Sequence, residues 1–494
     1  MKALIILGLC VFSATVVAQQ AQWQKTYGGA GFEDAHVVHE ILGEGYIVMG
    51  TSSSSGNGSN DCMMLKIDLE GNEIWMKTYG GNGDEDSHYG IITNDGGFAM
   101  ISYSNSFGSG DYDFYLIRTD GNGDTLWTKT YGDSLDQLGY CLQETTDGGF
   151  IMVGKAVRDS TGYLDIWMIK ADSTGTIEWE QYYGDSLDDY ARFVELTGDG
   201  GYILTGTTHN TDSGEAELYL VKTDGLGNLE WEKRFYGNEH TFGYSVQQTM
   251  LGDYVVSGYM YDQYYASGTY YNILVLKTDN FGNELWRKSP FSGGGAPNTH
   301  VSHSIRENSD GTYLLCGGTY VEVVCKTSMD PDTGLYISNM LLLRINADGS
   351  TAEYREVGMQ NGMNELGTYG VQTSDGGFVF CAYQGYDYQT DGQAYVVKTD
   401  ADFNYIKIGI DSRSKLTSAF SVFPNPSSDR ISIKIDGERM GVYTIFDASG
   451  RKVISGTIKG ANTEVNTKAL NPGCYNVAVD FEEGRYNKNL IITE

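Results

Sequence analysis

The sequence predicts an all-β protein: a seven-bladed β-propeller with four-stranded blades, followed by a small Ig-like β-sandwich. Three observations lead to this prediction: a repeat that returns every 52 residues, a composition with 65 glycines and only 6 prolines, and a change of pattern near Phe420. Abundant glycine between β-branched and aromatic runs is typical of short strands joined by tight turns.

The 52-residue repeat contains three recurring segments. One places Asp-Gly-Gly between two apolar runs, as in TTDGGFIM and TSDGGFVF, and predicts a hairpin. Another joins two apolar runs through an Asp/Gly/Asn turn, as in LVKTDGLGNLEW. Each repeat therefore holds four strands. The remaining segment reads WQKTYGG at Trp23, WMKTYGG at Trp75, WTKTYGD at Trp127, WEQYYGD at Trp179 and WEKRFYG at Trp231, always 52 residues apart. A looser copy, WRKSPFS, begins at Trp286, and a degenerate copy, EYREVGM, has Tyr354 in place of the Trp.

A single repeat is too small to bury both faces of its sheet, so the copies must stack, and ring closure removes the exposed edges. Seven repeats predict seven blades, with six or eight blades as the alternatives. The first copy supplies only Trp23–Tyr27 before the next inner strand begins. This segment or residues 404–410 can complete the last blade, and the sequence leaves both alternatives open.

These motifs resemble the WxKTYGG/DGGF/KTDxxGNxxW propeller repeats of secreted proteins of the Bacteroidetes type. The resemblance covers Trp23 to about Ile410. It implies a propeller fold and leaves the function open, because one fold hosts many functions.

The two ends of the chain suggest export. Residues 1–18 have the pattern of a signal peptide, with Lys2, an apolar stretch and Ala18 at the cleavage site. No later segment has the roughly 20 apolar residues of a transmembrane helix, so none is expected. We expect the propeller over residues 19–411, a polar linker over 412–419 and the sandwich over 420–494.

From Phe420 the strands SVFPNPSSDRISIKI, YTIFDASGRKVISGTI and LNPGCYNVAVDFEEGRYNKNLIITE alternate apolar and polar residues. This segment resembles the type A C-terminal sorting domain of type IX secretion substrates. The resemblance implies the type IX machinery as a partner, passage through the outer membrane, removal of the domain, and a mature protein that is released or anchored at the cell surface. The motif residues are Pro424, Asn425, Pro426, Asp447, Gly450 and Gly473.

The charge restricts the classes of partner. The formal net charge is −32, and all of it precedes Ser418, because nine basic and nine acidic residues follow from there. An acidic surface repels nucleic acids and anionic membranes, so we expect neither as a partner.

The cysteines give no metal site. No CxxC or Cys/His ligand spacing occurs among the six cysteines after residue 18. Cys316 and Cys325 can form a disulfide, and buried thiols are the alternative.

The chain also lacks GxSxG, HExxH and Walker-type motifs, so we expect no enzyme. His36 and His88 are equivalent by repeat position and are interpreted as structural. Carboxylates between the repeats suit either turn capping or Ca²⁺, and no other cofactor is expected. The calcium candidates are Asp84, Asp86, Asp136 and Asp188.

Tyrosine-rich loops interrupt the last repeats between the second and third strands. Tyrosine offers a rigid apolar face and a hydroxyl, which suits sugars and peptides. The sequence therefore predicts an extracellular protein that binds a glycan or protein. A secreted polysaccharide hydrolase or lyase and a structural surface or adhesin component are the alternatives. The candidate ligand-binding residues are Tyr261, Tyr264, Tyr265, Tyr270, Tyr386 and Tyr388.

Overall fold

The computed structural model contains only strands and connecting segments within the residues it describes. The described residues are 22–157, 162–210, 213–237, 240–265, 268–290, 298–323, 335–358, 363–385, 392–405, 420–423, 429–435, 441–447, 451–458, 460, 462–481 and 484–492. The predicted signal peptide (residues 1–18) and the predicted linker (residues 412–419) lie outside them. The chain divides into two compact units, and the first unit ends at Lys407.

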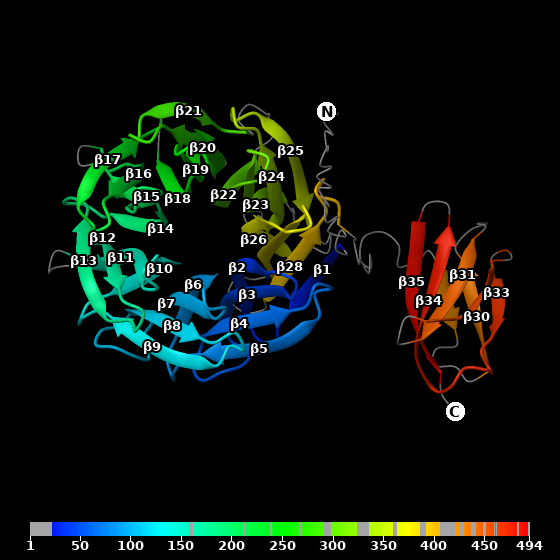
Figure 1. Ribbon diagram of the computed structural model, residues 1–494. Helices are drawn as coiled ribbons and strands as arrows, with labels where there is room; N and C mark the ends of the chain where they lie inside the picture. The colour runs from blue at the N-terminus through cyan, green and yellow to red at the C-terminus, as the bar shows by residue number, and fades with distance from the viewer. Residues whose placement is uncertain are drawn as a thin grey trace, which may run out of the picture. The chain divides into compact units, whose positions relative to one another are not determined.

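The first unit is a ring of seven four-stranded antiparallel sheets (Figure 1), which confirms the prediction of seven blades. In each blade the first strand lies innermost. Blade 1 consists of β2 (Glu33–Ile41), β3 (Gly45–Ser52), β4 (Asp61–Ile67) and β5 (Glu73–Tyr79). Blade 2 consists of β6 (Glu85–Ile92), β7 (Phe98–Ser104), β8 (Asp113–Thr119) and β9 (Thr125–Tyr131). Blade 3 consists of β10 (Gln137–Glu144), β11 (Phe150–Val157), β12 (Leu164–Ala171) and β13 (Ile177–Tyr183).

The next three blades repeat this order. Blade 4 consists of β14 (Tyr190–Leu196), β15 (Tyr202–His209), β16 (Ala216–Thr223) and β17 (Leu229–Phe235). Blade 5 consists of β18 (Thr241–Gln248), β19 (Tyr254–Tyr265), β20 (Gly268–Thr278) and β21 (Glu284–Lys288). Blade 6 consists of β22 (Asn298–Glu307), β23 (Tyr313–Val323), β24 (Leu335–Ile345) and β25 (Thr351–Val357).

Blade 7 closes the ring with strands from both ends of the repeat array. It consists of β26 (Asn364–Gln372), β27 (Phe378–Gly385), β28 (Gln393–Thr399) and β1 (Trp23–Tyr27). β1 pairs with β28 from Trp23 opposite Lys398 to Tyr27 opposite Ala394. The fourth strand is therefore the N-terminal segment, and the alternative of residues 404–410 is wrong.

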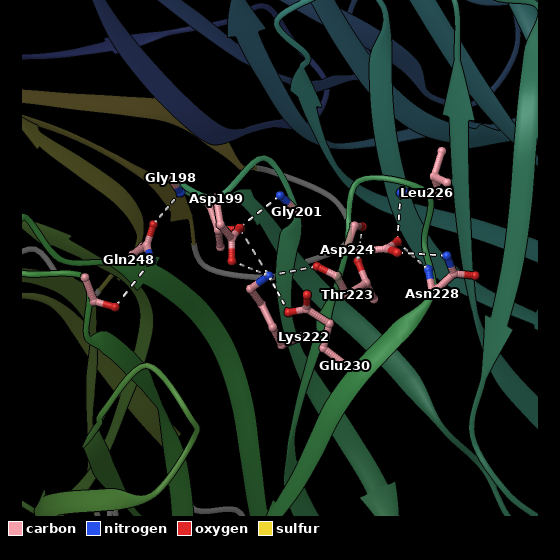
Figure 2. A network of polar contacts seen from close by, with 12 residues as sticks. Gly198, Asp199, Gly201, Lys222, Thr223, Asp224, Leu226, Asn228, Glu230 and Gln248 are labelled. Atoms are coloured by element: carbon pink, nitrogen blue, oxygen red, sulfur yellow. Dashed lines mark hydrogen bonds and ion pairs between the residues drawn. The ribbon is translucent and has the colours of Figure 1, made fainter.

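The recurring tryptophan forms the joint between neighbouring blades. Asp224 accepts hydrogen bonds from the backbone N–H groups of Leu226 and Asn228, both at 2.9 Å (Figure 2). This turn holds Gly227 at a φ of +77°, and a Cβ there would lie 2.7 Å from the Trp179 ring of the preceding blade. Glycine is required because of both the conformation and this close approach. The same contact joins Trp23 to Gly71, Trp75 to Gly123, Trp127 to Gly175, Trp231 to Gly282 and Trp286 to Gly349.

These tryptophans occupy equivalent places, as the repeat predicts, but their burial is unequal. Trp75, Trp127, Trp179 and Trp231 are half-buried, whereas Trp23 is only 3% exposed. Trp23 also donates its indole N–H to the Leu69 carbonyl at 2.8 Å. Replacing a half-buried Trp therefore costs less than replacing Trp23.

A second recurring contact fastens the Asp-Gly-Gly hairpin to the third strand. In blade 4, Lys222 Nζ lies 3.0 Å from Asp199 Oδ2 and 3.0 Å from Glu230 Oε2 (Figure 2). Asp199 also accepts the backbone N–H of Gly201 at 3.0 Å. The aspartate of this motif is therefore an element of the fold.

The second unit contains two packed sheets with their own apolar core. One sheet consists of β29 (Phe420–Phe423), β30 (Arg430–Ile435) and β33 (Asn462–Asn466). The other consists of β32 (Lys452–Thr457), β31 (Val442–Asp447), β34 (Gly473–Phe481) and β35 (Gly484–Ile492). The buried residues include Ile431, Ile433, Ile445, Val477 and Val479.

This arrangement agrees with the predicted sandwich. Of its motif residues, Asp447 ends β31 and Gly473 begins β34. The other four, Pro424, Asn425, Pro426 and Gly450, lie outside the described residues.

The described cysteines Cys62, Cys141, Cys316 and Cys381 are buried free thiols. Cys325, the partner proposed for Cys316, lies outside the described residues.

Candidate functional site

The first strand of every blade contains a β-bulge at the same repeat position. In blade 1 the pairing with β3 passes from Ala35 to Val37, so His36 is left without a partner. A bulge leaves one residue unpaired and redirects its side chain, and bulges are frequent next to binding and active sites. We call the seven residues skipped in this way the bulge ring: His36, His88, Tyr140, Arg192, Tyr244, His303 and Thr368.

The bulge ring forms a closed circle of contacts. The His36 and His88 rings lie 5.4 Å apart, and His88 lies 4.7 Å from Tyr140. The Arg192 guanidinium lies over Tyr140 at 4.5 Å and over Tyr244 at 5.3 Å. Three further contacts complete the circle through blades 5, 6, 7 and 1. The Tyr244 and His303 rings lie 5.3 Å apart, and His303 Nδ1 lies 3.0 Å from the Gly367 carbonyl oxygen. The Thr368 hydroxyl donates to the Ala35 carbonyl at 2.6 Å.

All seven side chains line one cavity of about 260 Å³. Tyr89, Phe193 and Tyr369, which follow ring residues in the sequence, line it too. Arg306 joins these three, since its Nε donates to the Tyr369 hydroxyl at 2.9 Å and its guanidinium lies 4.6 Å from the Phe193 ring. Tyr89 and Tyr369 hydroxyls lie 3.0 Å apart. Side chains from blades 2, 4, 6 and 7 therefore contact one another beside this cavity.

Several buried polar atoms at this cavity lack a hydrogen-bond partner within the described residues. They are Asp34 Oδ1, His88 Nε2 and Arg192 Nε. Buried polar groups are normally satisfied, so each unsatisfied group requires an explanation such as a bound molecule. Three such atoms belong to residues that line this one cavity.

The two equivalent histidines differ in their proton affinity. Burial disfavours the charged form of His36, but the Asp34 carboxylate 3.2 Å away outweighs this effect and raises the pKa of His36 to about 9. Burial, with His36 and Arg192 nearby, lowers the pKa of His88 to about 3. At neutral pH the His36 imidazole is therefore charged and the His88 imidazole neutral.

We expect His36 to make folding stability depend on pH. Its pKa is about 9 in the fold and near 6.5 in the unfolded chain, so its contribution is complete below pH 6.5 and is lost as the pH rises to 9. In thermal denaturation, the unfolding temperature of the unchanged chain should fall between pH 6.5 and 9, and this fall should be smaller in His36→Gln. His88→Gln is the control and should keep the slope, because His88 is neutral there in both states. An unchanged slope in His36→Gln would contradict the assignment.

Three of the four calcium candidates accept hydrogen bonds within the fold. Asp84 accepts the Asn60 amide at 2.7 Å, Asp86 accepts the Tyr103 hydroxyl at 2.7 Å, and Asp188 accepts the Leu164 N–H at 3.0 Å. Asp136 has one oxygen without a partner in the described part of the chain. No group of three or more His, Cys, Asp or Glu suited to a metal occurs among the described residues. Calcium binding stays a prediction.

The tyrosine-rich loops are only partly described. Tyr261 is half-buried in β19, and the side chains of Tyr264, Tyr265 and Tyr270 lie outside the described part, as do residues Tyr386 and Tyr388. An aromatic series nevertheless connects this hairpin to the bulge ring. Tyr261 lies 4.9 Å from Tyr271, Tyr271 lies 5.3 Å from Tyr259, and Tyr259 lies 5.4 Å from Tyr244. A shared tyrosine patch stays a prediction.

Sequence reasoning missed the bulge ring, although a signal for it is present. The residue before each ring position is always small: Ala, Ser or Gly. The ring position itself changes from repeat to repeat between His, Tyr, Arg and Thr. A polar position that varies directly after a consistently small residue is the signal that could have drawn attention to these seven positions.

Comparison with known families identifies the second unit. Residues 421–493 match the secretion system C-terminal sorting domain. These residues are a type IX secretion sorting domain. The sorting domain marks the chain for export to the cell surface or the extracellular space. The described part of the chain contains no helix with the length and hydrophobicity needed to cross a bilayer.

Comparisons with solved structures return propellers at low similarity. PorZ, a surface component of the type IX secretion system of Porphyromonas gingivalis, is 13% identical with a TM-score of 0.43, over 95% of this chain and 60% of PorZ. The chain thus spans less than two thirds of that relative. The propeller domain of the Trilobed protease from Pyrococcus furiosus is 10% identical with a TM-score of 0.41, over 78% of this chain and 100% of that domain.

An α-L-arabinanase from Penicillium chrysogenum is 12% identical with a TM-score of 0.39, over 63% of this chain and 93% of the arabinanase. No curated protein matches the chain in sequence. Resemblances this distant do not say what the propeller binds.

Proposed function

We propose that this exported propeller is an extracellular binding protein and that its ligand site is the bulge-ring cavity. The main support is the bulge ring itself: seven blades each direct one side chain into a single cavity, and three polar atoms there have no partner in the described residues. A ring of identical structural residues would suffice for packing. The observed mixture of His, Tyr, Arg and Thr instead offers different donors and acceptors at fixed places.

Neither Asp34 nor Asp86, the carboxylates beside His36 and His88, is suited to be the acid of a glycosidase. A glycosidase needs one carboxyl that carries a proton at working pH. Asp34 is paired with His36, and Asp86 accepts hydrogen bonds from Thr51 and Tyr103. Although burial opposes it, His88, His36 and these hydrogen bonds keep the pKa of Asp86 below its usual value. Asp86 is therefore an anion and no proton donor at neutral pH.

An array of glycans and extracellular proteins tests the proposal with the full chain. We expect at least one ligand to be retained, and expect His88→Ala to weaken it by about 30-fold, as for other central contact residues. Tyr236→Ala is the matched control, because Tyr236 is 71% exposed and lies outside the cavity. If the His88→Ala variant retains the ligand as well as the unchanged chain does, the binding site lies elsewhere. The absence of any ligand would favour a structural surface component.

A polysaccharide lyase is the second candidate, favoured by His88. This neutral imidazole has no hydrogen-bond partner at Nε2 within the described residues, and its ring lies 4.7 Å from the Tyr140 ring, so a proton acceptor and a phenol line the same cavity. Lyases need such a pair to remove a proton and release the leaving group. Ultraviolet absorbance of unsaturated products, measured with acidic polysaccharides, distinguishes a lyase from a binding protein.

A further inference from the structure

The inference concerns Arg192, which forms no ion pair within the described residues. Several other propeller arginines form ion pairs, for example Arg118 with Asp95 at 2.5 Å, Arg234 with Asp185 at 3.0 Å and Arg344 with Glu353 at 2.6 Å. Arg192 instead lies between the rings of Tyr140, Tyr190 and Tyr244, at 4.5, 5.3 and 5.3 Å. Its Nε has no hydrogen-bond partner.

Such an arginine is suited to an external anion. Aromatic faces offset part of the cost of removing the guanidinium from water, but they accept none of its hydrogen bonds in the plane. A planar guanidinium presents a fork of donors that matches the two oxygens of a carboxylate. Lys155 adds a second positive charge beside Tyr140, with its Nζ 5.9 Å from the ring centroid. An anion in the cavity therefore meets the Arg192 cation in a domain that is otherwise strongly acidic.

Blades 1 and 2 contribute the chemistry for hydroxyl groups. Asp34 Oδ1 can accept a hydrogen bond, and the neutral His88 can accept one through Nε2. Tyr140 and Tyr244, which lie on either side of Arg192 in the bulge ring, add aromatic rings to the cavity lining. The cavity of about 260 Å³ has room for a sugar unit rather than for a folded segment of protein.

We propose that the bulge-ring cavity binds an acidic sugar of the uronic acid class, with its carboxylate on Arg192 and its hydroxyls toward Asp34 and His88. This rests on the proposed function and specifies its ligand. The neutral His88 and the unpaired Arg192 act together. A ligand with hydroxyls but no carboxylate leaves Arg192 unsatisfied, and an anion without hydroxyls leaves His88 unsatisfied.

Calorimetric titration of the full chain tests this with glucuronate and galacturonate as probes, and with glucose and galactose as their neutral counterparts. We expect at least one uronate to bind, its neutral counterpart to bind at least about 10-fold more weakly, and affinity to fall as salt is raised. Arg192→Gln should remove uronate binding. Arg192→Lys should retain part of it, because the charge is kept and the planar fork is lost.

Thermal denaturation of both variants shows whether they fold. Equal binding of uronate and neutral sugar, or full binding by a folded Arg192→Gln, would overturn the inference, as would failure of every uronate. Inorganic phosphate binding as tightly as the uronates would also overturn it and reduce the site to a simple anion site. If the array finds a His88-dependent ligand while Arg192→Gln has no effect, the proposed function stands and only the ligand class fails.

Discussion

A chain that begins at Gly28, and so lacks β1, is expected to lose most of its resistance to unfolding. β1 supplies the fourth strand of blade 7, and its removal exposes the β28 edge. It also removes Trp23 and Tyr27, which are 3% and 7% exposed, and the hydrogen bond from the Tyr27 hydroxyl to the Gly71 carbonyl at 2.7 Å. Loss of a buried Trp side chain alone costs about 3–5 kcal/mol. Urea denaturation measures the change.

A chain that begins at Gln22 is the matched control, because it keeps β1 and should unfold like the longer chain. An unchanged midpoint in the shorter chain would show that another segment can take the open edge of β28. Residues 404–410, the alternative that the sequence offered, would be the first to examine. Trp23→Ala in the full chain should reproduce about 3–5 kcal/mol of the loss.

The second large effect is expected for Asp375→Ala in blade 7. Lys398 Nζ lies 3.0 Å from Asp375 Oδ2, and both side chains are 0% exposed. Burial lowers the pKa of Lys398 despite Asp375. Removing the carboxylate leaves a buried ammonium without its partner, and breaking a buried pair in this way costs about 3–5 kcal/mol. Urea denaturation at neutral pH should show this loss.

The repeat offers a control at the equivalent position of blade 3. Asp147 is paired with Lys170, but its side chain is 57% exposed, and Lys170 retains a second carboxylate, Glu178, at 2.7 Å. Asp147→Ala should therefore cost at most about 1 kcal/mol. Equal losses in the two variants would contradict the role of burial. The double variant Asp375→Ala/Lys398→Met should recover part of the stability, because the isolated charge is gone.

The sequence explains why blades 3 and 7 differ in this ion pair only once it is known which strand completes blade 7. In blades 3 and 4 the residue before the recurring Trp is Glu178 or Glu230, and it reaches the lysine of the adjacent strand. In blade 7 the fourth strand comes from the other end of the array, where Gln22 precedes Trp23. Gln22 bonds to Asp400 at 2.9 Å, so Lys398 depends on Asp375.

Much of the propeller was predictable because its motifs serve contacts that are the same in every blade. Trp179 packs on Gly227, and the Tyr183 hydroxyl donates to the carbonyl of the same glycine at 2.6 Å. The side chains that join one blade to the next must recur with each blade. The 52-residue period therefore reports the fold directly.

The sequence by itself determined the number of blades, the turns and the sorting domain, since each depends on local patterns or on contacts between neighbouring repeats. Only the tertiary structure decided which strand closes the ring and where the candidate site lies. The bulge ring unites residues from His36 to Thr368, and no two of them are close in the chain. The alternation of side chains along a strand could not place them either, because a bulge shifts the register by one residue. The skipped side chain then points into the central cavity, whereas regular pairing would direct it elsewhere.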